Sequence, residues 1–95
     1  MKKKVYIVRA YSAGVFMGEI VKRVGKVVTM KNARRLWYWS GAASLSQLAM
    51  EGVKTPQECK FPCPVNEVVL TEVVEILTCT EAAVENIAQV PIWKM

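Results

Sequence analysis

The stretch NARRLWYWSGAASLSQLAMEG, residues 32–52, sets the architecture that the rest of the chain must complete. It begins with two arginines and an unbroken Trp37-Tyr38-Trp39 run, and then passes through a corner of small residues. Ser44 stands three residues before a glutamine, which is the capping-box spacing that begins a helix, and Gly52 is of the type that ends one. We therefore predict a short amphipathic helix from Leu45 to this glycine, with one apolar face laid on a sheet.

Upstream of this stretch, apolar and β-branched residues alternate in a way that predicts three strands. The strands are expected over Lys4–Tyr11, Val15–Val21 and Val27–Met30. The turn signals between them are Ser12-Ala13-Gly14 and Val24-Gly25-Lys26. Loops this short do not allow a parallel crossover, so the three strands should form an antiparallel meander.

Irregular backbone is predicted at two places in this meander. Gly18 lies inside a strand and indicates a bulge or a close approach, and Asn32 with Ala33 is expected to break or bulge the third strand. Beyond that point we expect the chain to continue in extended form to Trp39. Alternation then predicts two faces: Arg35, Trp37 and Trp39 on one, and Arg34, Leu36 and Tyr38 on the other.

Downstream, a proline-containing connection over residues 54–65 should wrap over the body. Residues 67–77 fit either a helix or a strand, and their valine, isoleucine and threonine content favours one long strand. Thr78 or Thr80 should cap a second helix over Glu81–Gln89, followed by an extended tail that packs on the sheet or on a partner chain. The prediction is an α+β fold, a single domain over residues 1–95, with a four- to five-stranded mainly antiparallel sheet and two short helices.

Composition bears on where the protein acts and on how it associates. The chain of 95 residues is 53% hydrophobic, which is high for a small domain, so some apolar surface is expected in a homo-oligomer interface. No apolar run is long enough to span a bilayer, and the basic start has no signal-peptide core. We predict a cytoplasmic protein without a membrane partner.

Charge is distributed unevenly along the chain. Residues 1–35 carry ten Lys or Arg against one Glu, including the basic start Lys2-Lys3-Lys4, whereas residues 36–95 carry three Lys against seven Glu. The basic half could face the phosphates of a nucleic acid or of a small nucleotide, or the acidic half of a neighbouring subunit. Alternatively, strands from the two halves pair within one sheet and neutralise each other.

The residue inventory argues against several kinds of chemistry. There is no histidine and no aspartate, which removes the commonest general base and any Ser-His or Cys-His pair. Cys59, Cys63 and Cys79 are too few for a zinc site without histidine, and their odd number does not suit a disulfide framework. No glycine-rich phosphate loop is present. We predict a non-enzymatic protein with no catalytic residues, no cofactor and no metal.

The arginine and aromatic run contains residue types that suit ligand binding better than catalysis. Guanidinium groups pair with phosphate, and indole or phenol faces stack on bases, while the small corner leads to a helix N-terminus where anions bind. The alternative is that the aromatics belong to the core and the arginines form a solvated edge. The predicted ligand-binding residues are Arg34, Arg35, Trp37, Tyr38, Trp39, Ser40 and Ser44, joined by Arg9, Tyr11 and Ser12.

The runs VYIVRAYSAGVFMGEI (5–20) and KNARRLWYWSGAASLSQLAMEGVKTPQECKFPCPV (31–65) resemble a family of small phage, prophage and bacterial proteins of unknown function. The resemblance implies a phage context in the host cytoplasm and no mechanism, but single-domain phage accessory proteins frequently act by stoichiometric binding. By analogy of size and source alone, its phosphate-bearing ligand would be a nucleotide immune signal sequestered as an anti-defence measure. The alternatives are a nucleic-acid-binding protein and a protein-binding inhibitor of a host factor, with Trp39 or Trp93 as its anchor.

Overall fold

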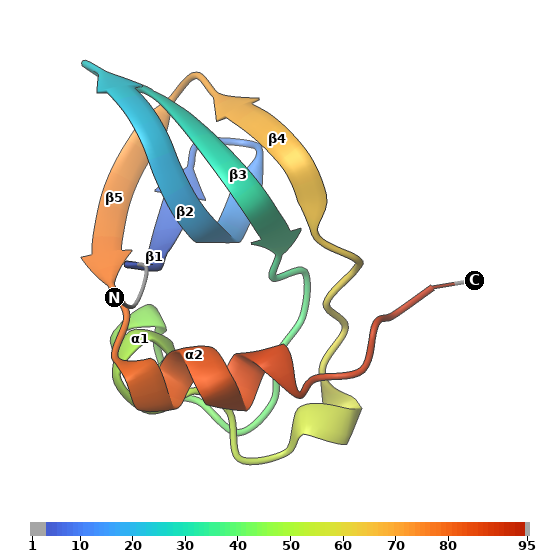
Figure 1. Ribbon diagram of the computed structural model, residues 1–95. Coiled ribbons are helices and arrows are strands. Elements are labelled where there is room, and N and C mark those ends of the chain that lie inside the picture. The colour runs from blue at the N-terminus through green and yellow to red at the C-terminus, as the bar shows by residue number, and fades with distance from the viewer. Residues whose placement is uncertain (1–3, 95) are drawn as a thin grey trace.

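The computed structural model describes residues 4–94, which form one five-stranded antiparallel sheet with two helices at one end of it (Figure 1). The predicted α+β class is confirmed, and Lys2 and Lys3 of the basic start lie outside the described residues. The strand order is β4-β3-β2-β1-β5. The elements are β1 (Tyr6–Ala10), β2 (Gly14–Val24), β3 (Val27–Arg35), α1 (Leu45–Glu51), the 3-10 turn η1 (Pro56–Glu58), β4 (Val65–Leu70), β5 (Val73–Thr78) and α2 (Glu81–Ala88).

The sheet curls because its two edge strands are consecutive in the chain. β4 ends at Leu70 and β5 begins at Val73, so two residues connect strands that lie on opposite edges. The edges meet at this connection, at the top of Figure 1, and diverge below it. The Tyr11 N–H donates to the Glu72 carbonyl at 2.8 Å and the Val73 N–H to the Lys26 carbonyl at 3.0 Å. These bonds fasten the connection to both flanking turns.

The prediction of a single strand over residues 67–77 is therefore wrong in its extent. The segment does form strand rather than helix, but it turns at Thr71 and Glu72. Leu70 before the turn and Ile76 after it belong to the same apolar cluster, so turning lets both halves of the run face one interior. The two adjacent polar residues within the apolar run were the available signal for the turn.

Two apolar clusters fill the fold, one within the curl of the sheet and one between the sheet and the helices. Ile7 and Val8 are adjacent on β1 and fully buried, but they enter different clusters because a strand alternates its side chains. The buried members of the cluster within the curl are Val8, Ala10, Phe16, Val28, Met30, Ala33 and Leu70. The cluster beneath the helices contains Ile7, Met17, Leu36, Leu48, Ala49, Val53, Cys59, Phe61, Ile87 and Val90.

The predicted bulge at Gly18 and Asn32 is confirmed. The register between β2 and β3 shifts between Met17 and Glu19, and Asn32 has a φ of 51°. A Cβ at position 18 would lie 2.9 Å from the Ala33 Cα and 3.0 Å from the Asn32 carbonyl oxygen. Glycine is required here because the neighbouring atoms belong to the backbone and cannot rotate away.

Both predicted helix starts are confirmed. The Ser44 hydroxyl accepts a hydrogen bond from the Gln47 N–H at 3.2 Å, and α1 ends at Gly52 with a φ of 82°. Thr80, rather than Thr78, caps α2 by accepting from the Ala83 N–H at 3.1 Å. Within residues 4–94, no helix is long and apolar enough to cross a membrane.

Candidate functional site: an exposed aromatic surface

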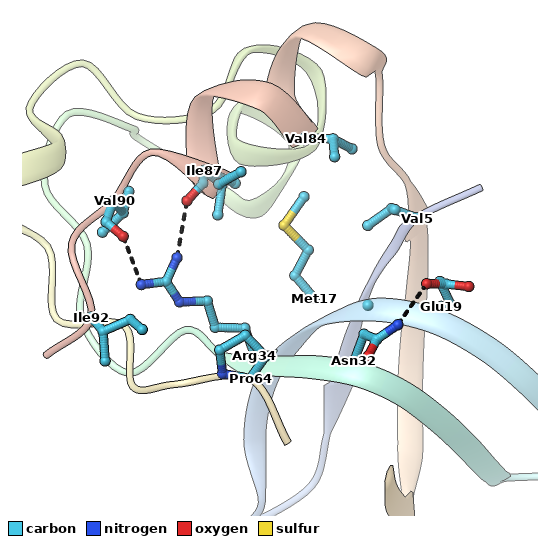
Figure 2. Close-up of a pocket in the computed structure, with 12 residues that line it drawn as sticks. Val5, Met17, Glu19, Asn32, Arg34, Pro64, Val84, Ile87, Val90 and Ile92 are labelled. Carbon is cyan, nitrogen blue, oxygen red and sulfur yellow. Dashed lines mark hydrogen bonds between the residues drawn. The ribbon is translucent and has the colours of Figure 1, made fainter. Parts of the chain in front are cut away.

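Arg34, the first of the predicted ligand-binding arginines, lies inside the body of the protein. It is 8% exposed, and its guanidinium reaches from β3 to the carboxyl end of α2 (Figure 2). All three guanidinium nitrogens donate to main-chain carbonyls. The acceptors are Pro62 for Nε (2.9 Å), Ile87 for Nη1 (3.1 Å), and Val90 (2.7 Å), Phe61 (3.1 Å) and Pro91 (3.2 Å) for Nη2.

This arrangement gives Arg34 a structural role. Carbonyls at the end of a helix have no partner within the helix and carry partial negative charge, so a cation satisfies them well. Burial lowers the Arg34 pKa, and the electrostatic effect of the Cys63 thiol raises it in part. The side chain is enclosed between β3, the 61–62 segment and the end of α2, so its charge does not lie on the outer surface beside Trp37 and Tyr38.

Arg35 points to the opposite side of β3 and joins the β1–β2 turn. Its Nη1 donates to the Ala13 carbonyl at 2.8 Å, and its guanidinium carbon lies 4.4 Å from the centre of the Phe16 ring. Tyr11, 70% exposed, and Ser12, with a φ of 64°, occupy the same turn. The structure therefore brings Arg35 together with Tyr11 and Ser12, but not with its neighbour in sequence.

Charge pairing within the sheet accounts for part of the uneven charge distribution. Arg9 Nε on β1 lies 3.1 Å from the Glu75 carboxylate on β5, and the two residues are directly opposite each other. Lys31 on β3 stands opposite Glu67 on β4 and 3.9 Å from Glu19 on β2. Strands from the basic half thus pair with strands from the acidic half, as one of the two sequence interpretations expected.

The corner before α1 is satisfied by its own capping interactions. The Ser44 hydroxyl takes the Gln47 N–H, and the Gln47 side-chain oxygen in return accepts from the Ala43 N–H at 2.8 Å. The Ser40 N–H faces the Cys59 sulfur at 3.4 Å. These contacts use the Ala43 and Gln47 N–H groups of the predicted anion site, and α1 has only seven residues.

Trp37 and Tyr38 instead contribute to a surface built from three distant segments. Tyr38 bridges to Lys60, Phe61 bridges to Ile92, and the Trp93 N–H donates to the Phe61 carbonyl at 3.0 Å. These contacts hold residues 37–38, 60–61 and 92–93 side by side. We call the set Trp37, Tyr38, Lys60 and Trp93 the aromatic surface.

The rings of this surface are ordered around one cation. The Trp37 and Trp93 indoles are stacked, with centroids 5.1 Å apart and planes within 4° of parallel. The Lys60 ammonium nitrogen lies 5.5 Å from the Trp37 ring, 5.7 Å from the Trp93 ring and 5.9 Å from the Tyr38 ring. Trp37 is nevertheless 58% exposed, Tyr38 50% and Trp93 38%. A large part of each side chain is therefore open to solvent.

The predicted alternation along Arg34–Trp39 holds only as far as the strand itself. β3 ends at Arg35, so Trp37 and Trp39 do not share a face: Trp37 is on the aromatic surface, whereas Trp39 packs against the buried cluster beneath the helices. Lys60 was missed altogether by sequence reasoning. Trp93 was predicted only as a tail anchor, because nothing in the sequence indicates that it stacks on Trp37.

A family model for a domain of unknown function, DUF6948, matches residues 2–87. The chain belongs to this family. Three members of the aromatic surface, Trp37, Tyr38 and Lys60, lie within the DUF6948 match, and Trp93 lies beyond it. No curated protein and no solved structure matches the chain.

The chemistry available to this DUF6948 chain at the aromatic surface is that of recognition. Two indoles and a phenol offer flat π-faces, and the lysine supplies a positive charge within 6 Å of their ring centres. Within residues 4–94 no group of three or more His, Cys, Asp or Glu side chains is placed to hold a metal ion. The surface can stack on a planar group and attract an anion at the same time.

Proposed function

We propose that this protein is a non-enzymatic binding protein whose aromatic surface holds a nucleotide unit. The base stacks on the outer face of the Trp37–Trp93 pair, and the phosphate lies beside the Lys60 ammonium. The observation that carries the proposal is the parallel, exposed tryptophan pair with a lysine within 6 Å of both rings. Tyr38 provides a second stacking face on the same surface.

A nucleotide has a base and a phosphate, and each of them finds a partner on the aromatic surface. Stacking of a base on an aromatic side chain contributes about 1–3 kcal/mol and tolerates any base, because every base has a π-face. A lysine acts as a point charge that attracts phosphate. The surface is open rather than enclosed, so the same unit is accepted as a free nucleotide or within a single strand.

The biological setting is part of the same proposal. We propose a phage accessory protein of the host cytoplasm that sequesters a nucleotide immune signal as a homo-oligomer. Support for self-association comes from the exposed apolar side chains of the sheet, which include Val21, Val24, Val65, Val69 and Val74. Support for sequestration comes from the analogy of size and source.

Binding is tested by fluorescence anisotropy with a labelled thymidine oligonucleotide and by competition with ATP. We expect Trp93→Ala to weaken binding about tenfold, the loss of one stacking partner. Lys60→Ala should also weaken it and should lower the slope of affinity against salt by about one unit. Lys22→Ala is the matched control, because this exposed lysine is on β2 near its turn to β3, at the end of the sheet away from the helices (Figure 1).

The result that overturns the nucleotide proposal is an unbound oligonucleotide and unbound ATP with a correctly folded protein. Equal effects of the Lys60 and Lys22 variants would overturn the assignment to the aromatic surface. If neither the oligonucleotide nor ATP binds, the exposed rings, together with Ile92 at 52% exposure, become a candidate anchor for a protein partner. Tryptophan and tyrosine are the residue types that dominate such interfaces.

A further inference from the structure

A groove of about 330 Å³ lies between α2 and the bulged part of β2 and β3 (Figure 2). This volume is at the lower end of the range for small-molecule sites. Met17 lies across its middle. Val5 and Val84 form the wall on one side of Met17, and Ile87 and Val90 form the wall on the other side, beneath the end of α2. The lining is therefore largely apolar.

The polar groups of the groove stand at its two ends. Figure 2 shows Asn32 and Glu19 on one side of Met17 and the Arg34 guanidinium on the other. The Asn32 side-chain nitrogen donates to the Glu19 carboxylate at 3.0 Å, and that carboxylate is 3.9 Å from the Lys31 ammonium. One end is thus acidic and paired, while the other carries a cation.

The charge of Arg34 is not paired with a carboxylate within residues 4–94, and the acidic group that raises its pKa is the Cys63 thiol. Its five acceptors are all neutral carbonyls, and no carboxylate of the described residues lies within ion-pair distance. A guanidinium has five N–H groups, and Nη1 uses one of its two on Ile87. A cation buried to this degree is stabilised further by an anion, because its hydration has been lost.

We propose that the groove binds a small aliphatic carboxylate, with its carboxylate at Arg34 Nη1 and its hydrocarbon chain lying along Met17 towards Val84. The charges fix the direction: Arg34 attracts the acid group, whereas the carboxylate of Glu19 at the other end already pairs with Lys31 and accepts from Asn32. The apolar walls exclude water from the chain of the ligand and provide the hydrophobic part of the binding free energy. The groove adjoins the aromatic surface at Ile92 but contains none of Trp37, Tyr38, Lys60 and Trp93, and the proposal does not depend on the proposed nucleotide function.

The test uses the full chain and sodium octanoate as the probe, with octanol as the uncharged control of the same chain length. We expect titration calorimetry to show octanoate binding about tenfold or more tightly than octanol, the value of one hydrogen bond to a charged group. In ¹³C-methyl NMR spectra, the methyl signals of Met17 and Val84 should shift with octanoate concentration.

A variant that fills the groove gives the structural control without disturbing Arg34. Ala88 lines the groove and is exposed on α2, so Ala88→Leu places hydrocarbon in it while keeping helix propensity. Ala82→Leu makes the same change at an exposed position of α2 that does not line this groove. We expect octanoate binding to fall about tenfold in the first variant and to stay unchanged in the second.

Three results would overturn the proposal. They are no octanoate binding at millimolar concentration, octanol binding as tightly as octanoate, and equal binding by the two alanine variants. The nucleotide titration reports on a different surface, so failure of either proposal is distinguishable from failure of the other.

Discussion

Replacing Arg34 by methionine removes a guanidinium but keeps an unbranched chain of similar reach. Three of the hydrogen bonds lost are buried, those to Ile87, Phe61 and Val90. The carbonyls of Ile87 and Phe61 keep the backbone N–H groups of Val90 and Trp93 as donors, whereas the Val90 carbonyl loses its donor. Hydrogen bonds to a charged group contribute about 1.5–3 kcal/mol each. The desolvation cost that the arginine itself no longer incurs offsets part of this, so we expect a net loss of about 3 kcal/mol. That is a large share of the roughly 5–15 kcal/mol by which a domain is stable.

The assay is urea unfolding followed by tryptophan fluorescence, with the slope of free energy against urea checked for constancy. Arg35→Met is the matched control in the neighbouring residue. That arginine makes one exposed hydrogen bond to Ala13 and a ring contact with Phe16, so its loss should cost less than about 1 kcal/mol. Losses for the two variants that agree within about 0.5 kcal/mol would refute the structural role assigned to Arg34.

Four further predictions concern other parts of the fold. Trp93→Ala should lower the free energy of unfolding by about 1–2 kcal/mol, since it removes a stacked aromatic pair, and should speed hydrogen exchange in the C-terminal tail. Gly18→Ala should cost more in urea unfolding than Gly25→Ala. A Cβ at position 18 meets backbone at 2.9 Å, whereas at position 25 it meets nothing within 4 Å and the cost is the backbone strain of a φ of 58°; the reverse order would contradict the bulge geometry. Burial raises the pKa of the Cys79 thiol from 9.0 to about 11, so its contribution to stability is complete below pH 9 and should be lost as pH rises through 11, which a Cys79→Ala comparison across that range measures. Alkylation at pH 8 should label the exposed Cys63 and spare Cys79.

Local structure was largely predictable from the sequence. The turn before Gly14, the turn at Gly25, the bulge at Gly18 and the caps at Ser44 and Thr80 all depend on residues close together in the chain. In each case a backbone conformation or an unpaired N–H group requires a particular residue type. Such requirements are visible without knowledge of the rest of the fold.

The arrangement of the strands was harder to predict because alternation identifies a strand but not its neighbour. The 67–77 run has one composition throughout, yet its halves lie on opposite edges of the sheet. The turn between them is favoured by contacts with Tyr11 and Lys26, which are distant in sequence. No local pattern reports those contacts.

In the candidate site, too, local features were predictable from the sequence and long-range contacts were not. Arg34 and Arg35 are identical residues in adjacent positions, and one is buried by the helices while the other lies on the surface beside Phe16. Strand alternation predicted that they separate, but not which of them the end of α2 would cover. The stacking of Trp37 on Trp93 depends on the path of the whole chain between them. The aromatic run in the sequence therefore indicated Trp37 and Tyr38 but not the residues that lie beside them in the fold.

The pairing of the first strand with the last one constrains how the chain reaches its native state. β1 to β3 are connected by tight turns and can associate as soon as they leave the ribosome, but Tyr6 pairs with Thr78 and Ile7 with Leu77. The outer edge of β1 therefore stays uncovered until synthesis is nearly complete, and the non-local contacts make folding slow relative to a helical protein of this size. A nascent chain that stops before Val73 exposes an open strand edge, the kind of surface on which aggregation begins.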